Sequence, residues 1–165
     1  MRRMSSNLLW GSVAVALLSG CSASNPSAAE QAPGQAWSHG QVWLADLAEA
    51  QSQAKTENKL VFVNFTGSDW CPGCQNLRAS VLNTSEFAAF AKESLVLVEI
   101  DFPRRKPQTE AERKANETLA AKHRIEAFPT VLVFDAGGRE LSRQVGYRGL
   151  DAKEYVAGLR GLKKS

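Results

Sequence analysis

Residues 60–82 read LVFVNFTGSDWCPGCQNLRASVL. The stretch opens with a mostly apolar run from Leu60 to Phe65, which predicts a strand buried on both faces of a sheet. The segment from Pro72 to Leu82 predicts a helix, with Pro72 in the first turn, where its missing N–H is harmless. Cys71 and Cys74 lie at the junction, so the sequence predicts two thiols at the start of a helix that follows a central strand.

The Cys-x-x-Cys spacing indicates a reactive pair rather than a structural brace. A disulfide between Cys71 and Cys74 closes a tiny loop and therefore restricts the unfolded chain very little. The unpaired N–H groups and the dipole at a helix start favour a negative charge on Cys71, and the thiolate is the nucleophilic form. We therefore expect Cys71 to attack a substrate disulfide and Cys74 to displace the substrate from the mixed disulfide.

The rest of the chain alternates between helical and extended patterns. Predicted extended segments are Val42–Leu44, Leu95–Ile100, Thr130–Phe134 and Leu141–Tyr147. Predicted helices start at capping residues Asp46, Asn83, Thr109 and Asp151, each followed by Glu three residues later. The first of these ends at Lys55–Lys59, and an earlier start at Ser38 with Gln41 fits equally well.

The element order predicts an α/β domain around a mixed sheet of four strands, or of five. Long crossovers between the three apolar strands favour parallel pairing. Gly137-Gly138 predicts a tight turn that makes the last two strands an antiparallel hairpin, with Leu141–Tyr147 at the sheet edge. Helices are expected on both faces.

The first 20 residues predict a lipoprotein signal peptide. Arg2 and Arg3 precede a short apolar run, and small residues and Cys21 follow it. We expect Cys21 to be lipidated, with residues 21–37 as a flexible tether and residues 38–165 as the folded domain. The alternative is an ordinary signal that is cleaved after Cys21, near Ala23 or Ala28-Ala29.

Charge argues against nucleic acid as a partner. Without residues 1–20 the chain keeps 18 basic and 17 acidic residues, a net charge of +1, whereas nucleic-acid binding requires a basic face. The loop from Phe102 to Gln108 holds three adjacent cations, Arg104, Arg105 and Lys106. Such a run is most often a solvated loop, and contact with an acidic partner is the alternative.

Three segments together resemble the thioredoxin family: Val63-Asn64-Phe65, Trp70-Cys71-Pro72-Gly73-Cys74 and Phe128-Pro129-Thr130. The element order matches over about residues 42–162, and the segment from Phe65 to Cys71 is similar to secreted thioredoxin-like proteins of bacterial envelopes. The resemblance implies a thioredoxin-like fold, and a cis-proline at Pro129 that lies beside the cysteines and keeps metal away from them. It also implies a Phe128 backbone that pairs with an extended substrate, and Trp70 as a substrate platform.

Two positions depart from the thioredoxin pattern. Asn64 stands where thioredoxins carry a buried aspartate that accepts the proton of the resolving cysteine, and an amide is no base. Asp69, Glu99 or water are the candidates to replace it, and the alternative for Asn64 itself is a hydrogen-bonding role in the core. The order Pro72-Gly73 is reversed from that of thioredoxins; together with the absence of a histidine between the cysteines, it predicts an intermediate or reducing potential.

Two other functions remain as alternatives. A zinc site needs a second Cys/His pair, and His39 and His123 are far apart in the chain. A binding or chaperone module on the same fold would not need both cysteines. We therefore expect a monomeric reductase or isomerase without cofactor or metal, acting on protein disulfides with an upstream redox partner. We place it on the periplasmic side of the envelope, with the outer membrane favoured because Ser22, not Asp, follows Cys21.

Overall fold

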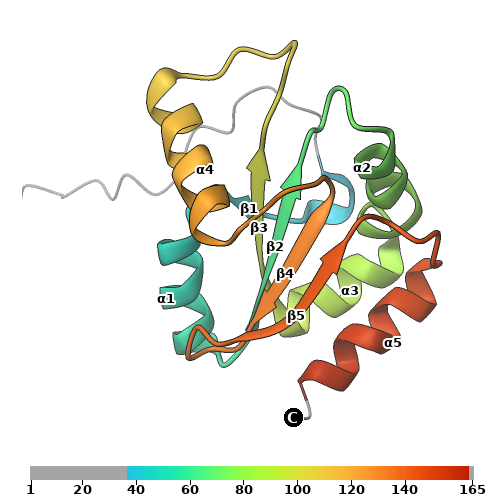
Figure 1. Cartoon of the computed structure of the whole chain (residues 1–165). Helices are drawn as coiled ribbons and strands as arrows, with labels where there is room; N and C mark the ends of the chain where they lie inside the picture. The colour runs from blue at the N-terminus through green and yellow to red at the C-terminus, as the bar shows by residue number, and fades with distance from the viewer. Residues whose placement is uncertain (1–36, 164–165) are drawn as a thin grey trace, which may run out of the picture. The chain divides into compact units, whose positions relative to one another are not determined.

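The computed structural model describes residues 37–163. Its centre is a five-stranded mixed sheet with the strand order β1-β3-β2-β4-β5 (Figure 1). The strands are β1 (Trp43–Leu44), β2 (Leu60–Thr66), β3 (Leu95–Asp101), β4 (Thr130–Phe134) and β5 (Glu140–Val145). The α/β fold class, the mixed sheet and the five-stranded alternative are thereby confirmed.

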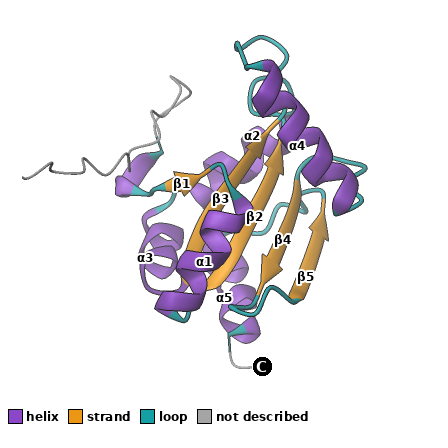
Figure 2. Cartoon of the chain, turned by 90° about the vertical axis from the view of Figure 1, so that its left-hand side faces the viewer, coloured by secondary structure: helices purple, strands orange, loops and turns teal. Residues whose placement is uncertain are grey.

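Helices cover both faces of this sheet, as expected (Figures 1 and 2). The helical segments are η1 (Ser38–Gly40), α1 (Leu47–Glu57), α2 (Pro72–Leu77), η2 (Arg78–Leu82), α3 (Ser85–Ser94), α4 (Glu110–Lys122) and α5 (Ala152–Leu162). Among these described helices, none is both long and apolar enough to cross a membrane.

Each face of the sheet has its own hydrophobic core, because successive side chains of a strand point to opposite faces. Phe62 packs with residues of α2, η2, α3 and α5 on one face. Val61, Val63 and Phe65 pack on the other face with α1, while partly buried residues of α4 border that core. All seven residues of β2 are buried, so the prediction of a strand buried on both faces is confirmed.

The predicted parallel arrangement is correct for β2 and β3 but wrong for β4, which runs antiparallel to β2. The position of α4 explains the difference. Gln108, just before α4, and Asn116, in its middle, both donate side-chain hydrogen bonds to the carbonyl of Asp101 at the end of β3. The helix therefore remains near that end of the sheet, and β4 starts there instead of at the opposite end.

Local signals located the helix ends well. Thr109 and Asp151 form complete capping boxes, and Asp46 caps α1 by accepting two backbone hydrogen bonds. The prediction of Asn83 as the cap of α3 is wrong, because the hydroxyl of Thr84 accepts the N–H of Phe87. The alternative helix start at Ser38 is also wrong, since η1 is a separate short turn.

Two further segments refine the prediction. The chain is helical from Pro72 to Leu82, as predicted, but its last part, η2, is a wider π-helical turn. The predicted hairpin is present: Gly138 adopts a φ of 85° in the turn between β4 and β5, a conformation that glycine takes without strain. The edge strand β5 ends at Val145, two residues earlier than predicted.

Candidate active site

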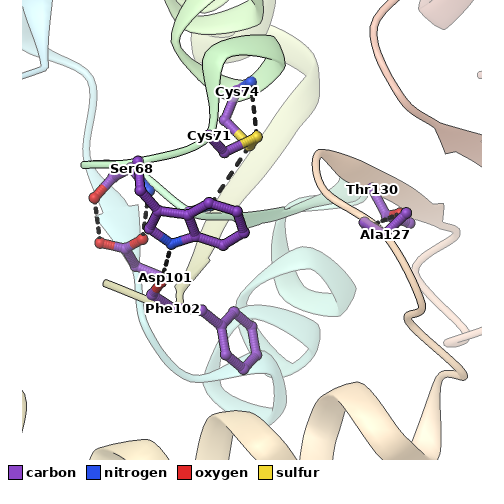
Figure 3. Close-up of a disulfide and its surroundings, with 9 residues drawn as sticks. Ser68, Cys71, Cys74, Asp101, Phe102, Ala127 and Thr130 are labelled. Atoms are coloured by element: carbon purple, nitrogen blue, oxygen red, sulfur yellow. Dashed lines mark hydrogen bonds between the residues drawn. A yellow bond between two sulfur atoms is a disulfide. The ribbon is translucent and has the colours of Figure 1, made fainter. Parts of the chain in front are cut away.

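Cys71 and Cys74 form a disulfide at the start of α2 (Figure 3). Cys71 is the N-cap of this helix, and its Sγ accepts the N–H of Cys74 at 3.2 Å. Pro72 occupies the first turn, as predicted, and its side chain is exposed. The sequence thus places the first sulfur where backbone N–H groups converge, a position that stabilises a thiolate.

Both sulfur-bearing residues are nearly buried, with 5 % of Cys71 and 4 % of Cys74 exposed. Cys74 Sγ accepts a weak hydrogen bond from the N–H of Gly67 at 3.5 Å. Gly67 is required at this position, since a Cβ there would lie 2.5 Å from the Trp70 ring. The turn between β2 and α2 thus packs tightly against the Trp70 ring and donates one N–H to the sulfur of Cys74.

Pro129 lies beside the cysteine pair, although it is distant in sequence. The Phe128–Pro129 bond is cis, as the resemblance implied. A Cβ on Gly73 would lie 3.3 Å from Pro129 Cδ, so the proline ring packs against the backbone between the two cysteines. Sheet pairing of β4 starts at Thr130, whose hydroxyl donates to the carbonyl of Ala127 (Figure 3). The residue Phe128 therefore precedes the paired part of the strand.

Trp70 is half-buried and held on several sides. Its Nε1–H donates to the carbonyl of Phe102 at 2.7 Å, and the edge of its ring meets Phe128. The guanidinium of Arg104 lies 3.7 Å from the centroid of the Trp70 ring, within the range of a cation–π interaction. One face of the Trp70 ring is thus covered by an arginine, which the sequence did not predict.

Asp69 organises the basic loop. Its carboxylate accepts the backbone N–H groups of Arg104, Arg105 and Lys106 at 3.0, 2.7 and 3.0 Å. These hydrogen bonds, led by that of Arg104, hold the Asp69 pKa below its usual value. Asp69 therefore positions Arg104 against Trp70 and does not line the cavity that holds Cys74.

Next to this loop, Ser68 joins two charged groups, the Asp101 carboxylate and the Lys106 ammonium. Its backbone N–H and its hydroxyl both donate to the carboxylate of Asp101 at the end of β3, as Figure 3 shows. The ammonium group of Lys106 donates to the Ser68 hydroxyl at 2.9 Å. The sequence did not indicate a role for Ser68 or Asp101; the available signal was a polar residue close to the C-terminal end of each of the two neighbouring strands β2 and β3.

Asn64 lies close to Cys74, since both residues line one small cavity. It is 4 % exposed, and its Oδ1 has no hydrogen-bond partner among the described residues. The register pairs Asn64 on β2 with Glu99 on β3. Both residues line a small cavity together with Cys74 and Arg78. Burial raises the pKa of Glu99 to about 7.

The described residues include no cluster of three or more His, Cys, Asp or Glu side chains that could hold a metal ion. His39 lies in η1, and His123 lies at the end of α4, where its ring contacts Phe65 and Phe134. The two histidines therefore do not form a group with the cysteine pair.

Comparison with known proteins agrees with this geometry. A family model described as a thioredoxin-like domain matches residues 47–161. The disulfide bond reductase DsbH of Chlamydia pneumoniae is 36 % identical over 117 residues, which cover 71 % of this chain and 70 % of that protein. The thioredoxin-related protein DsbJ of the same organism is 32 % identical, and the match covers 62 % of this chain but only 29 % of that longer protein.

Solved structures give the same result for the fold. A DsbH oxidoreductase superposes with a TM-score of 0.70 at 31 % identity, over 81 % of this chain and 94 % of the other. The C-terminal domain of DsbD from Neisseria meningitidis, in its oxidised form, superposes with a TM-score of 0.52 at 19 % identity over 73 % of this chain and 98 % of that domain, a likeness of fold alone.

Proposed function

The chain belongs to the thioredoxin-like family, and from this membership we propose that it reduces disulfide bonds in proteins of the bacterial cell envelope. It is a thiol–disulfide oxidoreductase. The single observation that carries the proposal is the Cys71–Cys74 disulfide at the N-terminus of α2. The reducing direction is supported by the name of the relative DsbH, a disulfide bond reductase.

We assign the attacking role to Cys71 and the resolving role to Cys74. In the reduced protein the N–H of Cys74 and the start of α2 stabilise a thiolate on Cys71. This thiolate attacks a substrate disulfide, one substrate sulfur leaves as a thiolate, and a mixed disulfide forms. Cys74 then attacks Cys71 Sγ, which forms the disulfide seen here and releases the second substrate thiolate.

The proposed substrate is an extended protein segment next to the cysteines. Phe128 precedes the paired part of β4, so its backbone is in position to pair with such a segment. Pro129, which packs against Gly73, brings that segment close to Cys71. The half-buried ring of Trp70, with Arg104 on one face, borders the same place. An upstream redox partner would reduce the pair again, and the protein would act as a monomer.

The direction of electron flow is testable through the reduction potential of Cys71/Cys74. We expect equilibration with glutathione redox buffers to give a value at or below about −180 mV, the range of isomerases and reductants of this fold. The protein should carry Cys21→Ser, so that only the Cys71/Cys74 pair responds. A potential near about −120 mV would identify a strong oxidant and would overturn the reductase assignment.

We further propose that the protein is a lipoprotein anchored through Cys21. The signal peptide (residues 1–20), Cys21 and the tether (residues 21–37) lie outside the described residues, except for Trp37. Their sequence supports a location on the periplasmic side of the envelope, with the outer membrane favoured because Ser22 follows Cys21.

Mass spectrometry of the intact protein tests the anchor. Protein extracted from membranes of a Gram-negative host should start at Cys21 and carry a diacylglyceryl group, whereas the Cys21→Ser variant should leave the membrane fraction. A wild-type mass without lipid would refute the anchor without affecting the oxidoreductase assignment.

A further inference from the structure

Cys74 has to lose a proton before it can attack Cys71, and little solvent reaches it, since only 4 % of the residue is exposed. It lines a cavity of about 10 Å³, which is close to the space that one water molecule needs. Of the described residues around this cavity, Arg78 and Glu99 are the charged ones, and Glu99 alone is a carboxylate. The cavity therefore offers one base to the Cys74 thiol.

The surroundings of Glu99 suit a carboxyl group that gains and loses a proton. Glu99 on β3 pairs in the sheet register with Asn64 on the adjacent strand β2. The buried Oδ1 of Asn64 is an acceptor without a donor among the described residues. A protonated Glu99 carboxyl can donate a hydrogen bond to such an acceptor, whereas an ionised carboxylate cannot. The Nδ2–H groups of the same amide can donate to an ionised carboxylate, so Asn64 is a suitable neighbour for Glu99 in either protonation state.

We propose that Glu99 is the base that takes the proton of Cys74 when Cys74 displaces the substrate. The inference rests on the proposed function and adds a residue to it. The proton of Cys74 passes through the shared cavity to the Glu99 carboxylate, which becomes a carboxylic acid. The electron pair left on Cys74 Sγ forms the bond to Cys71 Sγ, and the substrate sulfur leaves with the pair of the bond that breaks. Glu99 later returns the proton to solvent.

The charges that face Glu99 decide when it can act. Arg78 on η2 and Lys106 on the basic loop favour its ionised form, while burial and Asp101 on the same strand oppose it. Burial is the largest of these effects and brings the pKa to about 7. Below that pH Glu99 is protonated and cannot accept a proton, so the resolving step should slow as the pH falls through about 7 and level off above it.

Stopped-flow kinetics with a bis(nitrobenzoate) disulfide separate the two chemical steps. The reduced full-length chain, carrying Cys21→Ser, releases one coloured thiolate when Cys71 attacks and a second when Cys74 resolves the mixed disulfide. In Glu99→Gln we expect the second phase to slow about 10- to 100-fold at pH 7, since general bases contribute at least that much. The first phase should change far less.

The pH profile separates a base from a structural residue. The second phase of the parent chain should show an inflection near the Glu99 pKa of about 7. In Glu99→Gln the rate should instead keep rising with hydroxide, without a plateau, and Glu99→Asp should restore a plateau. Glu117→Gln, an exposed change on α4, is the matched control and should behave like the parent.

Two results would overturn the inference. One is a parent profile without an inflection, a measurement that needs no variant at Glu99 and stands even if Glu99→Gln does not fold. The other is a folded Glu99→Gln chain whose second phase equals that of the parent. If the parent chain releases no second thiolate at all, the proposed function itself fails, which is a different outcome.

Discussion

Replacement of Cys71 by serine is expected to reduce insulin-type disulfide reduction to the rate of the added reductant alone. A serine hydroxyl does not ionise at neutral pH and cannot form a disulfide, so neither the attack nor the mixed disulfide survives. The measurement is turbidity of reduced insulin with a thiol as electron source. Cys21→Ser is the matched control and should retain full activity in the purified protein.

Replacement of Cys74 by serine should instead stop the reaction halfway. Cys71 still attacks, but no second thiol displaces the substrate, so the mixed disulfide accumulates. In a Cys21→Ser background, a non-reducing gel or an intact mass should show one substrate chain per protein. Full reductase activity of Cys71→Ser, or a covalent adduct on Cys71→Ser and none on Cys74→Ser, would contradict the assigned roles.

Replacement of Phe62 by alanine should strongly lower the free energy of unfolding. Phe62 is fully buried, and its ring packs against Trp43, Phe87 and Tyr155, with centroids 6.0, 5.4 and 6.5 Å away. A phenylalanine removed from such a core leaves a cavity and costs about 3–5 kcal/mol of unfolding free energy. Urea unfolding of the oxidised protein measures the change.

The control for Phe62→Ala is Val42→Ala, a change at a side chain that is 65 % exposed. Exposed positions usually change the free energy of unfolding by no more than about 0.5 kcal/mol. If both variants unfolded at the same urea concentration as the parent, the packing of Phe62 between the sheet and its helices would contribute little to stability, and the prediction would be wrong.

Elements that depend on neighbouring residues were predicted well from the sequence. The apolar run of β2, the first-turn proline of α2, and the capping boxes at Thr109 and Asp151 all act within a few residues. The direction of β4 depends instead on hydrogen bonds from Gln108 and Asn116 to the end of β3. No local pattern contains that information, so the general preference for parallel crossovers gave the wrong direction.

The residues of the candidate site also fall into those that a local motif or the family resemblance indicates and those whose positions depend on distant parts of the chain. The Cys-x-x-Cys motif is local, and the resemblance to thioredoxins indicated the cis bond before Pro129. Arg104 was only one cation of a charged run, because its position depends on Asp69, 35 residues earlier. The cavity shared by Cys74 and Glu99 depends on the register of β2 with β3 and on the position of α2 above them.

The sulfur of Cys71 is both the proposed nucleophile and the atom that caps the first turn of α2. A thiolate accepts the N–H of Cys74 more strongly than a disulfide sulfur does, so this hydrogen bond stabilises the reduced folded chain more than the oxidised one. A thermodynamic cycle joins folding to reduction. In this cycle, a difference in folding free energy between the reduced and oxidised chains equals a difference in reduction potential between the folded and unfolded chains. For a two-electron couple, about 1.4 kcal/mol corresponds to about 30 mV. Comparing the unfolding of the two redox forms would therefore measure how far the folded structure shifts the potential from that of the unfolded chain.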